Sequence, residues 1–104
     1  MNKNRTHRRF IWDAGKDAVN RAKHGVGFAA SVRAFDDPQR LILEDARHSQ
    51  QERRLFCLGK VDGKVLTVRF TIRGLRIRIF GAAYWRKYAI LYETEAFQTP
   101  GEPE

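Results

Sequence analysis

The stretch RRLFCLGKVDGKVLTVRFTIRGLRIRIFGAAYWRK, residues 53–87, decides the fold that this sequence predicts. Its apolar residues alternate with polar ones in three runs, and Asp62-Gly63 and Arg73-Gly74 separate the runs. Glycine accepts the positive φ that tight turns require, so these dipeptides between β-branched runs indicate hairpins. The stretch therefore predicts a three-stranded antiparallel meander.

Alternation divides the second and third runs into an apolar and a basic face. The residues that we assign to the core are Leu66, Val68, Phe70, Ile72, Leu75, Ile77 and Ile79. A turn of two or four residues would place Arg69 opposite Arg78 and Thr71 opposite Arg76 on the other face. Because opposed like charges destabilise a sheet, we interpret this face as one that binds phosphate. A solvated basic face without a ligand is the alternative.

Composition points to one globular domain with an anionic partner. The chain has 104 residues, of which 42% are apolar and 31% charged, and its net charge is +8. A polyanion is the expected partner: nucleic acid first, an acidic protein second and an anionic membrane surface third. No apolar run approaches the roughly 18 residues of a membrane helix, and the N-terminus lacks the apolar segment of a secretory signal. We therefore expect a cytoplasmic protein that spans no membrane.

Before the meander, the sequence predicts a strand at 10–12, a helix, a second short helix and another strand. Asp13 is the expected N-cap of the first helix, which should run to Lys23 with Gly25 as its left-handed stop. Its thin buried stripe would be Ala14, Ala18 and Ala22. A neighbouring stripe of Lys16, Asn20 and Lys23 could contact RNA or simply face solvent.

The second helix should cover residues 27–35, with Phe28, Val32 and Phe35 in the core, and end before Pro38. A strand at 39–45 and a polar loop at 46–51 follow. A last helix should cover residues 84–96 and bury Tyr88 and Leu91. Cys57, inside an apolar strand, is expected to be a small buried hydrophobe without a disulfide.

These elements predict an α+β fold in a single domain, residues 1–104. Its antiparallel sheet of four to five strands should pack with two N-terminal helices and one C-terminal helix. The ordered core should cover about residues 9–97. The basic N-terminal tail and the acidic, proline-containing C-terminal tail are expected to be flexible.

The loop before the meander gathers the residues that could carry chemistry. Histidines and cysteine are too scattered for a metal-ligand set, so no metal or cofactor is expected. RNA can be cut without metal if a base takes the 2′-hydroxyl proton and cationic groups stabilise the phosphorane. His48 could move protons, helped by Glu52, since an imidazole transfers protons near neutral pH. An idle or structural loop histidine is the alternative.

The sequence resembles one family, the BrnT-type ribonuclease toxins of bacterial toxin–antitoxin pairs, over about residues 10–95. Motifs that carry the resemblance in the first half are Phe10, Trp12, Asp13, Lys16, Asn20, Lys23-His24-Gly25-Val26, Phe28 and Phe35-Asp36-Asp37-Pro38. Those in the second half are Glu44-Asp45, Arg47-His48-Ser49, Glu52-Arg53-Arg54, Leu58-Gly59, Val61-Asp62-Gly63, Thr71, Arg73-Gly74 and Ile77-Arg78-Ile79.

The resemblance implies a RelE-like fold, metal-independent cleavage of RNA and inhibition of translation. It also implies neutralisation by a cognate antitoxin, typically a small ribbon-helix-helix protein through which the toxin would reach operator DNA. The catalytic residues that we predict are His48, Glu52, Arg69, Arg78 and Arg86. Predicted RNA-binding residues are Lys16, Lys23, Arg47, Arg53, Arg76, Tyr84, Trp85 and Lys87. Tyr84 or Trp85 would stack on a splayed base.

One departure from the family pattern bears on activity. Many members carry Ser-Ala-Arg after the last strand, whereas this chain reads Gly81-Ala82-Ala83 and lacks the arginine at position 83. Arg86 or Arg78 would then have to replace it. The alternative is a catalytically weak member that acts as an antitoxin-binding co-repressor or a nucleic-acid-binding module.

Overall fold

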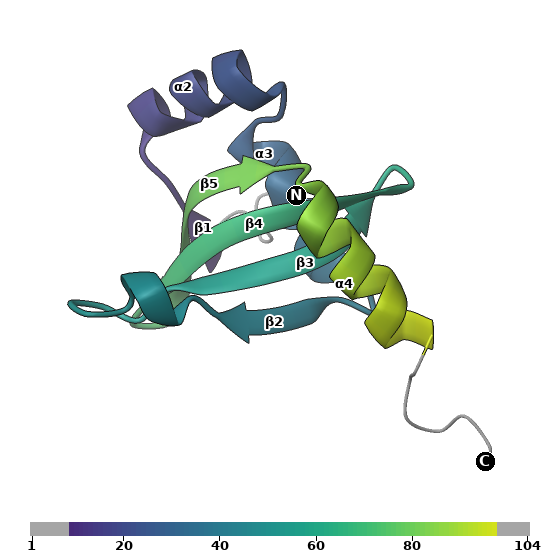
Figure 1. The fold of residues 1–104 in the computed structure, drawn as a ribbon. Coiled ribbons are helices and arrows are strands. Elements are labelled where there is room, and N and C mark those ends of the chain that lie inside the picture. Colours follow the sequence, from purple (N-terminus) through teal and green to yellow (C-terminus); the bar gives the residue numbers. More distant parts are fainter. Residues whose placement is uncertain (1–8, 98–104) are drawn as a thin grey trace.

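A five-stranded sheet with strand order β1-β5-β4-β3-β2 organises the computed structural model, which describes residues 9–97 (Figure 1). The strands are β1 (Phe10–Ile11), β2 (Leu41–Glu44), β3 (Leu55–Val61), β4 (Lys64–Arg73) and β5 (Arg76–Ala83). The α-helices are α2 (Ala14–His24), α3 (Phe28–Ser31) and α4 (Arg86–Phe97), and the 3-10 helices are η1 (Val32–Asp36) and η2 (Ala46–His48). The α+β class and the central meander are thus as the sequence predicts. The two tails lie outside the described residues.

The tight turns form where the glycine dipeptides predict them. Asp62 and Gly63 have φ of 53° and 85°, and the two positive values in succession are typical of a type I′ hairpin between β3 and β4. Gly74, with φ of 62°, opens a two-residue turn between Arg73 and Arg76. Both hairpins are therefore fixed by local turn chemistry.

The direction of β1 and the size of α3 differ from expectation. Phe10 and Ile11 pair in parallel with Ile77 and Arg78 of β5, so the sheet is mixed and not wholly antiparallel. A two-residue strand carries no local signal of its pairing direction. In the sheet β1 lies at the outer edge of the meander, beside β5. The second N-terminal helix is only four residues of α-helix that continue as the 3-10 helix η1.

The register between β4 and β5 also differs from the predicted one. Thr71 lies opposite Arg78, and Arg69 lies opposite Gly81. Two causes combine: the two-residue turn pairs Arg73 with Arg76, and a register shift between Arg69 and Phe70 adds a residue to β5. Arg69 and Arg78 therefore do not face each other.

Two core assignments at this hairpin were wrong. Leu75 is 98% exposed and Ile72 is 58% exposed, because the hairpin tip extends past the elements that cover the sheet. The remaining alternate residues behave as predicted: Leu66, Val68, Phe70 and Ile79 are buried, and Ile77 packs against the core.

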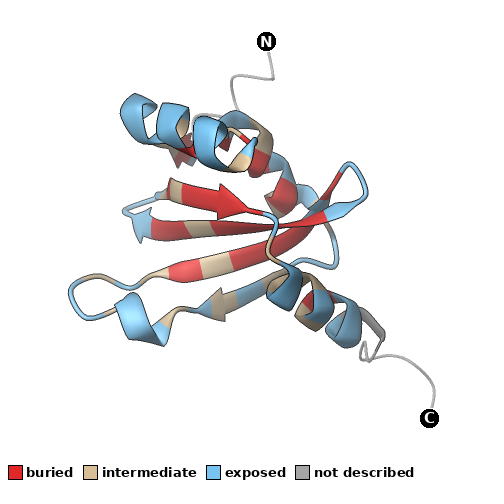
Figure 2. Ribbon diagram, turned by 45° about the horizontal axis from the view of Figure 1, so that its top comes forward, coloured by how far each residue is buried: buried red, intermediate tan, exposed pale blue. Residues whose placement is uncertain are grey.

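Each face of the sheet has its own apolar core (Figure 2). The larger core joins β3, β4 and β5 to α3 and η1, and buries Phe28, Val32 and Cys57. Burial raises the pKa of the Cys57 thiol to about 12, which agrees with its predicted role as a hydrophobe. The smaller core joins the opposite face to α4 through Tyr92, with Tyr88 and Leu91 packed against it as predicted.

Helix α2 has the predicted ends but not the predicted buried side. The Asp13 carboxylate accepts a hydrogen bond from Lys16 N–H (2.9 Å), and Gly25 has φ of 74°. Ala14, Ala18 and Ala22 are all exposed, so that stripe was wrong.

The buried residue of α2 is Asn20, which is 9% exposed. Its Nδ2 donates to the carbonyls of Val26 (2.9 Å) and Ala82 (2.8 Å), and its Oδ1 accepts from Ala82 N–H (3.2 Å). The side-chain amide thereby pairs with Ala82 as a neighbouring strand would, and it covers an open edge of β5.

Helix α4 begins two residues later than predicted because β5 continues to Ala83. The Tyr92 hydroxyl donates to the Asp37 carboxylate (2.5 Å), which also accepts from Lys60 N–H (2.8 Å). Burial alone would raise the pKa of Asp37, but these hydrogen bonds outweigh it and hold the pKa below its usual value. This network fastens α4 to the chain that follows η1.

Candidate functional site

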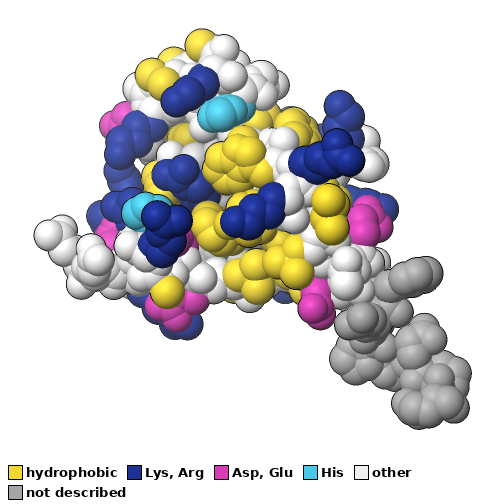
Figure 3. All heavy atoms as spheres, viewed as in Figure 1, with side chains coloured by type: hydrophobic (Ala, Val, Ile, Leu, Met, Phe, Trp, Pro, Cys, Tyr) yellow, Lys and Arg dark blue, Asp and Glu magenta, His cyan; other side chains and the backbone are white. Residues whose placement is uncertain are grey.

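A groove runs across the part of the sheet face that α4 leaves open. It consists of two adjoining pockets, which we name the α2-side pocket and the α4-side pocket, and both are lined by Arg69 and Trp85. In Figure 3 hydrophobic side chains gather at the centre of this face and Lys and Arg side chains surround them. Such a surface suits an anionic ligand with flat apolar parts.

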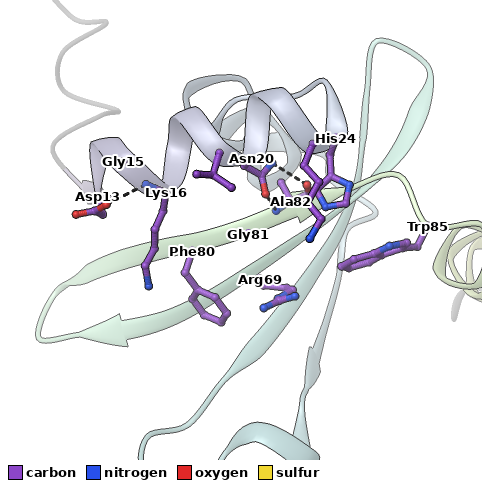
Figure 4. A pocket seen from close by; sticks show the side chains of 12 residues that line it. Asp13, Gly15, Lys16, Asn20, His24, Arg69, Phe80, Gly81, Ala82 and Trp85 are labelled. Carbon is purple, nitrogen blue, oxygen red and sulfur yellow. Dashed lines mark hydrogen bonds between the residues drawn. The ribbon is translucent and has the colours of Figure 1, made fainter.

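The α2-side pocket lies between α2 and β5 and has a volume of about 500 Å³. Besides the two shared residues, its lining consists of Asp13, Gly15, Lys16, Val19, Asn20, Lys23, His24, Phe80, Gly81 and Ala82. Figure 4 shows Lys16 and His24 extending from α2 toward the side on which Phe80, Arg69 and Trp85 lie. The His24 and Trp85 rings meet edge to face, with centroids 6.3 Å apart.

The α4-side pocket lies between the 45–48 loop and the start of α4, and has a volume of about 370 Å³. Its further lining residues are Asp45, His48, Phe56, Arg86, Lys87 and Tyr88. The ring of Tyr88 contacts those of Phe56 (centroids 5.1 Å apart) and Trp85 (6.2 Å). The α4-side pocket therefore combines Arg69 with the imidazole of His48, the cationic side chains of Arg86 and Lys87, and three aromatic rings.

Arg69 owes its position to the irregularity in the sheet. The extra residue of β5, Phe80, places its ring 5.1 Å from the Arg69 guanidinium carbon and 4.5 Å from that of Arg54. Gly81, the partner of Arg69 across the ladder, has no side chain, and a Cβ there would lie 3.3 Å from Arg69 Nε. The bulge and the glycine together let the guanidinium lie over the strand.

His48 is oriented by a carboxylate. Its Nδ1 lies 2.8 Å from Asp45 Oδ2, and the Asp45 side chain is 13% exposed whereas that of His48 is 64% exposed. Asp45 is itself held by the ladder-like bond from its N–H to Arg54 O (2.8 Å). When Nδ1 carries the proton donated to Asp45, the second ring nitrogen is left with a lone pair that can accept a proton.

Glu52 contacts arginines and not His48. Its carboxylate lies 3.3 Å from Arg73 Nη2 and 3.6 Å from Arg54 Nη2. With His48 it lines a further hollow beside the groove. Arg54 is the arginine whose guanidinium lies over the Phe80 ring. The ion pairs of Glu52 suit a residue that positions Arg54 better than one that transfers protons.

The remaining predicted site residues fall into two groups. Those that line the groove are Lys16, Lys23, Trp85, Arg86 and Lys87. Those outside both pockets are Arg47, Arg53, Arg76, Arg78 and Tyr84. Within the second group, Arg53 pairs with Glu44 (3.5 Å) and Tyr84 lies under Lys64 (5.6 Å).

Position 83 lies outside the groove. Ala83 is 2% exposed at the end of β5 and lines neither pocket. Of the two arginines that could replace a family arginine there, Arg86 lines the α4-side pocket and Arg78 does not.

Several groove residues were missed at the sequence level. Asp45, Phe56 and Tyr88 line the α4-side pocket, and His24 and Phe80 line the other. Phe56 alternates with core residues of β3, and this signal could have placed it on the basic face.

In the 9–97 range, no group of three or more His, Cys, Asp and Glu residues could hold a metal ion. In the same range no helix is long and apolar enough to cross a membrane.

Fold and site together define a small α+β protein whose mixed sheet presents a basic, aromatic groove with a carboxylate-oriented histidine. The family model described as "Ribonuclease toxin, BrnT, of type II toxin-antitoxin system" matches residues 12–88, most of the chain. The chain therefore belongs to this family of ribonuclease toxins, and membership implies an antitoxin partner. A search of curated proteins found no match to the chain.

Proposed function

We propose that this protein is a toxin that cleaves RNA in the cytoplasm without a metal ion, and so inhibits translation until a cognate antitoxin neutralises it. One observation carries the proposal: His48, oriented by Asp45, lines the same pocket as Arg69 and Arg86. A proton acceptor and two guanidiniums in one hollow are what cleavage by the neighbouring 2′-hydroxyl requires.

The reaction assigns one role to each group. His48 accepts the 2′-hydroxyl proton as that oxygen attacks the adjacent phosphorus. Arg69 and Arg86 stabilise the negative charge that grows on the phosphorane oxygens. The bond from phosphorus to the 5′-oxygen breaks, and this oxygen takes a proton from water. The hydroxide that remains takes the proton from His48, which restores the enzyme. The products are a 2′,3′-cyclic phosphate and a 5′-hydroxyl end.

The other cations support binding instead of chemistry. Lys16, Lys23 and Lys87 border the groove and would contact phosphates, while Trp85 would stack on an unpaired base. Outside the pockets, Arg47, Arg53, Arg76 and Arg78 would add to the long-range attraction of RNA, as Tyr84 adds stacking area. Glu52 would position Arg54 and Arg73.

The test is cleavage of unpaired RNA by the purified protein in excess EDTA. Activity should persist, and the new 3′ ends should be cyclic phosphates. His48→Ala should slow cleavage by about 10²–10⁴-fold, the usual contribution of general acid–base catalysis. Lys64→Ala, outside the groove, is the matched control and should cleave normally. Loss of activity in EDTA that magnesium restores would contradict the mechanism.

A second candidate function is binding without cleavage, which the missing arginine at position 83 favours. In that case the protein would act only through its antitoxin, a small ribbon-helix-helix protein, and through it on operator DNA. Tight antitoxin binding without RNA cleavage under any condition would identify this case. Because the toxin carries a net charge of +8, its partner should be acidic and associate more slowly as salt rises.

A further inference from the structure

The α2-side pocket has no part in the chemistry just described, although it has the larger volume of the two. It meets the α4-side pocket at Arg69 and Trp85. A phosphate bound by Arg69 would therefore lie between two hollows, each within the range of volumes that small-molecule sites occupy.

The contents of the α2-side pocket match one flanking nucleotide. Phe80 and Trp85 supply aromatic surfaces, and Lys16 and Lys23 supply charge for a neighbouring phosphate. At the outer end, Asp13 Oδ2 is engaged by the Lys16 N–H, and its carboxylate can also accept a hydrogen bond from the amino group of a base. Aromatic rings, cations and a hydrogen-bond acceptor together suit a nucleotide better than a bare phosphate.

Helix α2 is otherwise hard to explain by packing. Val19 is 64% exposed, and Asn20 is its one buried residue. A helix that buries so little adds little to the core, yet it forms a whole wall of this pocket.

We propose that the groove is a two-base site, in which unpaired RNA binds with consecutive bases splayed apart. One base occupies the α2-side pocket, the next occupies the α4-side pocket, and Arg69 holds the phosphate that joins them. This inference rests on the proposed function and adds its substrate: an unpaired two-nucleotide step whose one half is bound by α2. A paired helix is excluded because its bases stay stacked on each other.

A pair of substitutions on α2 tests whether the α2-side pocket contributes to RNA binding. Val19→Glu puts a carboxylate into the lining, whereas Ala18→Glu puts the same charge on the adjacent, exposed residue that lines neither pocket. Neither residue is buried, so both variants should fold. The probe is a fluorescein-labelled, unpaired RNA of ten nucleotides with a 2′-O-methyl group at every position, which cannot be cleaved, and the readout is anisotropy at fixed salt.

Binding by Val19→Glu should weaken about tenfold or more relative to Ala18→Glu, given what one stacked base contributes. A 2′-deoxy dinucleoside monophosphate should compete at least about fivefold better than either mononucleotide, for the same reason. A duplex of the same sequence should compete poorly.

Equal binding by Val19→Glu and Ala18→Glu, or a dinucleoside monophosphate that competes no better than a mononucleotide, would overturn the two-base site. So would a Val19→Glu protein that loses affinity for the antitoxin alone, since the pocket would then belong to that partner. Because the probe is not cleaved, these outcomes do not depend on catalysis. A two-base site can fail while cleavage in EDTA persists, and it can hold in a protein that does not cleave.

Discussion

Replacing Asn20 with alanine should loosen α2 more than its position on a largely exposed helix suggests. The side chain makes three hydrogen bonds to buried backbone groups of Val26 and Ala82. Each such bond contributes about 0.5–1.5 kcal/mol, so Asn20→Ala should cost about 2–4 kcal/mol. That is a large part of the roughly 5–15 kcal/mol that stabilises a small domain.

Two measurements would detect this loss of stability. Thermal melting of the intact chain should show a fall of about 8–32 °C, because about 1 kcal/mol shifts the midpoint of such a domain by 4–8 °C. Hydrogen exchange should show whether the α2 amides lose protection before the sheet does, as expected if the helix opens first. Val19→Ala is the matched control: Val19 is 64% exposed on the same helix and should change stability by less than about 0.5 kcal/mol.

An Asn20→Ala protein that melts within about 2 °C of the wild type and keeps its α2 amides protected would refute the reasoning. The contacts of α2 with β5 would then hold the helix without the amide. If the helix opens alone, RNA affinity should fall along with amide protection, because the α2-side pocket loses its wall.

Three further predictions concern the sheet and its fastening to the helices. Gly59→Ala should prevent normal folding, because the new Cβ would lie 2.2 Å from the carbonyl oxygen of buried Ala34. The measurement is the loss of soluble protein. The comparison site is Gly63, where a side chain would strain only φ. Arg76→Thr should leave the melting temperature unchanged or raise stability by up to about 1 kcal/mol, because Arg76 lies opposite Arg73; a clear loss of stability would reveal a favourable partner. Asp37→Asn should make the stability of the fold less sensitive to acid. The pKa of Asp37 is lowered in the folded protein, so its ionised form stabilises the fold above pH about 4. This stability is lost as the pH falls through the folded pKa. Urea midpoints at pH 7 and pH 3 measure it, and an equal acid response in wild type and variant would contradict this assignment.

The features that sequence predicted well are those with local causes. Asp13 caps α2 and Gly25 ends it because both effects need only neighbouring backbone. Asp62-Gly63 forms its hairpin for the same reason. Alternation assigns correctly the side of the meander that α3 and η1 cover, but it misses that α4 buries part of the other side.

Non-local pairing explains the errors. The role of Asn20 depends on an open edge of β5 that lies 62 residues away in sequence, and no spacing within α2 reveals it. Alanine is apolar enough to suggest a buried stripe, yet the less exposed side of α2 carries Asp17, Asn20 and His24. Leu75 continues the alternation of β5 but sits in the turn, where no element covers it.

The sequence predicted several of the cations that line the groove but not the shape of the groove. Arg69, Trp85 and Arg86 line the groove, whereas Arg78 lies two pairs along the ladder from Arg69 and lines neither pocket. Charge patterning predicts that a face is basic, but which cations meet in one hollow depends on the bulge and on where α4 starts.

The groove therefore depends on two departures from a regular sheet. A regular continuation of the ladder from Thr71–Arg78 would set Phe80 opposite Arg69. The bulge sets Gly81 there instead, while the Phe80 ring still contacts the Arg69 guanidinium. The extended backbone of β5 then runs on to Ala83, so that Trp85 falls in the short connection before α4. From that connection its ring contacts His24 of α2 and Tyr88 of α4, and it becomes the wall that both pockets share. A single inserted or deleted residue at 79–81 would shift this register and change which side chains of β5 lie beside Arg69, so the length of this segment, and not its charge alone, determines the shape of the groove.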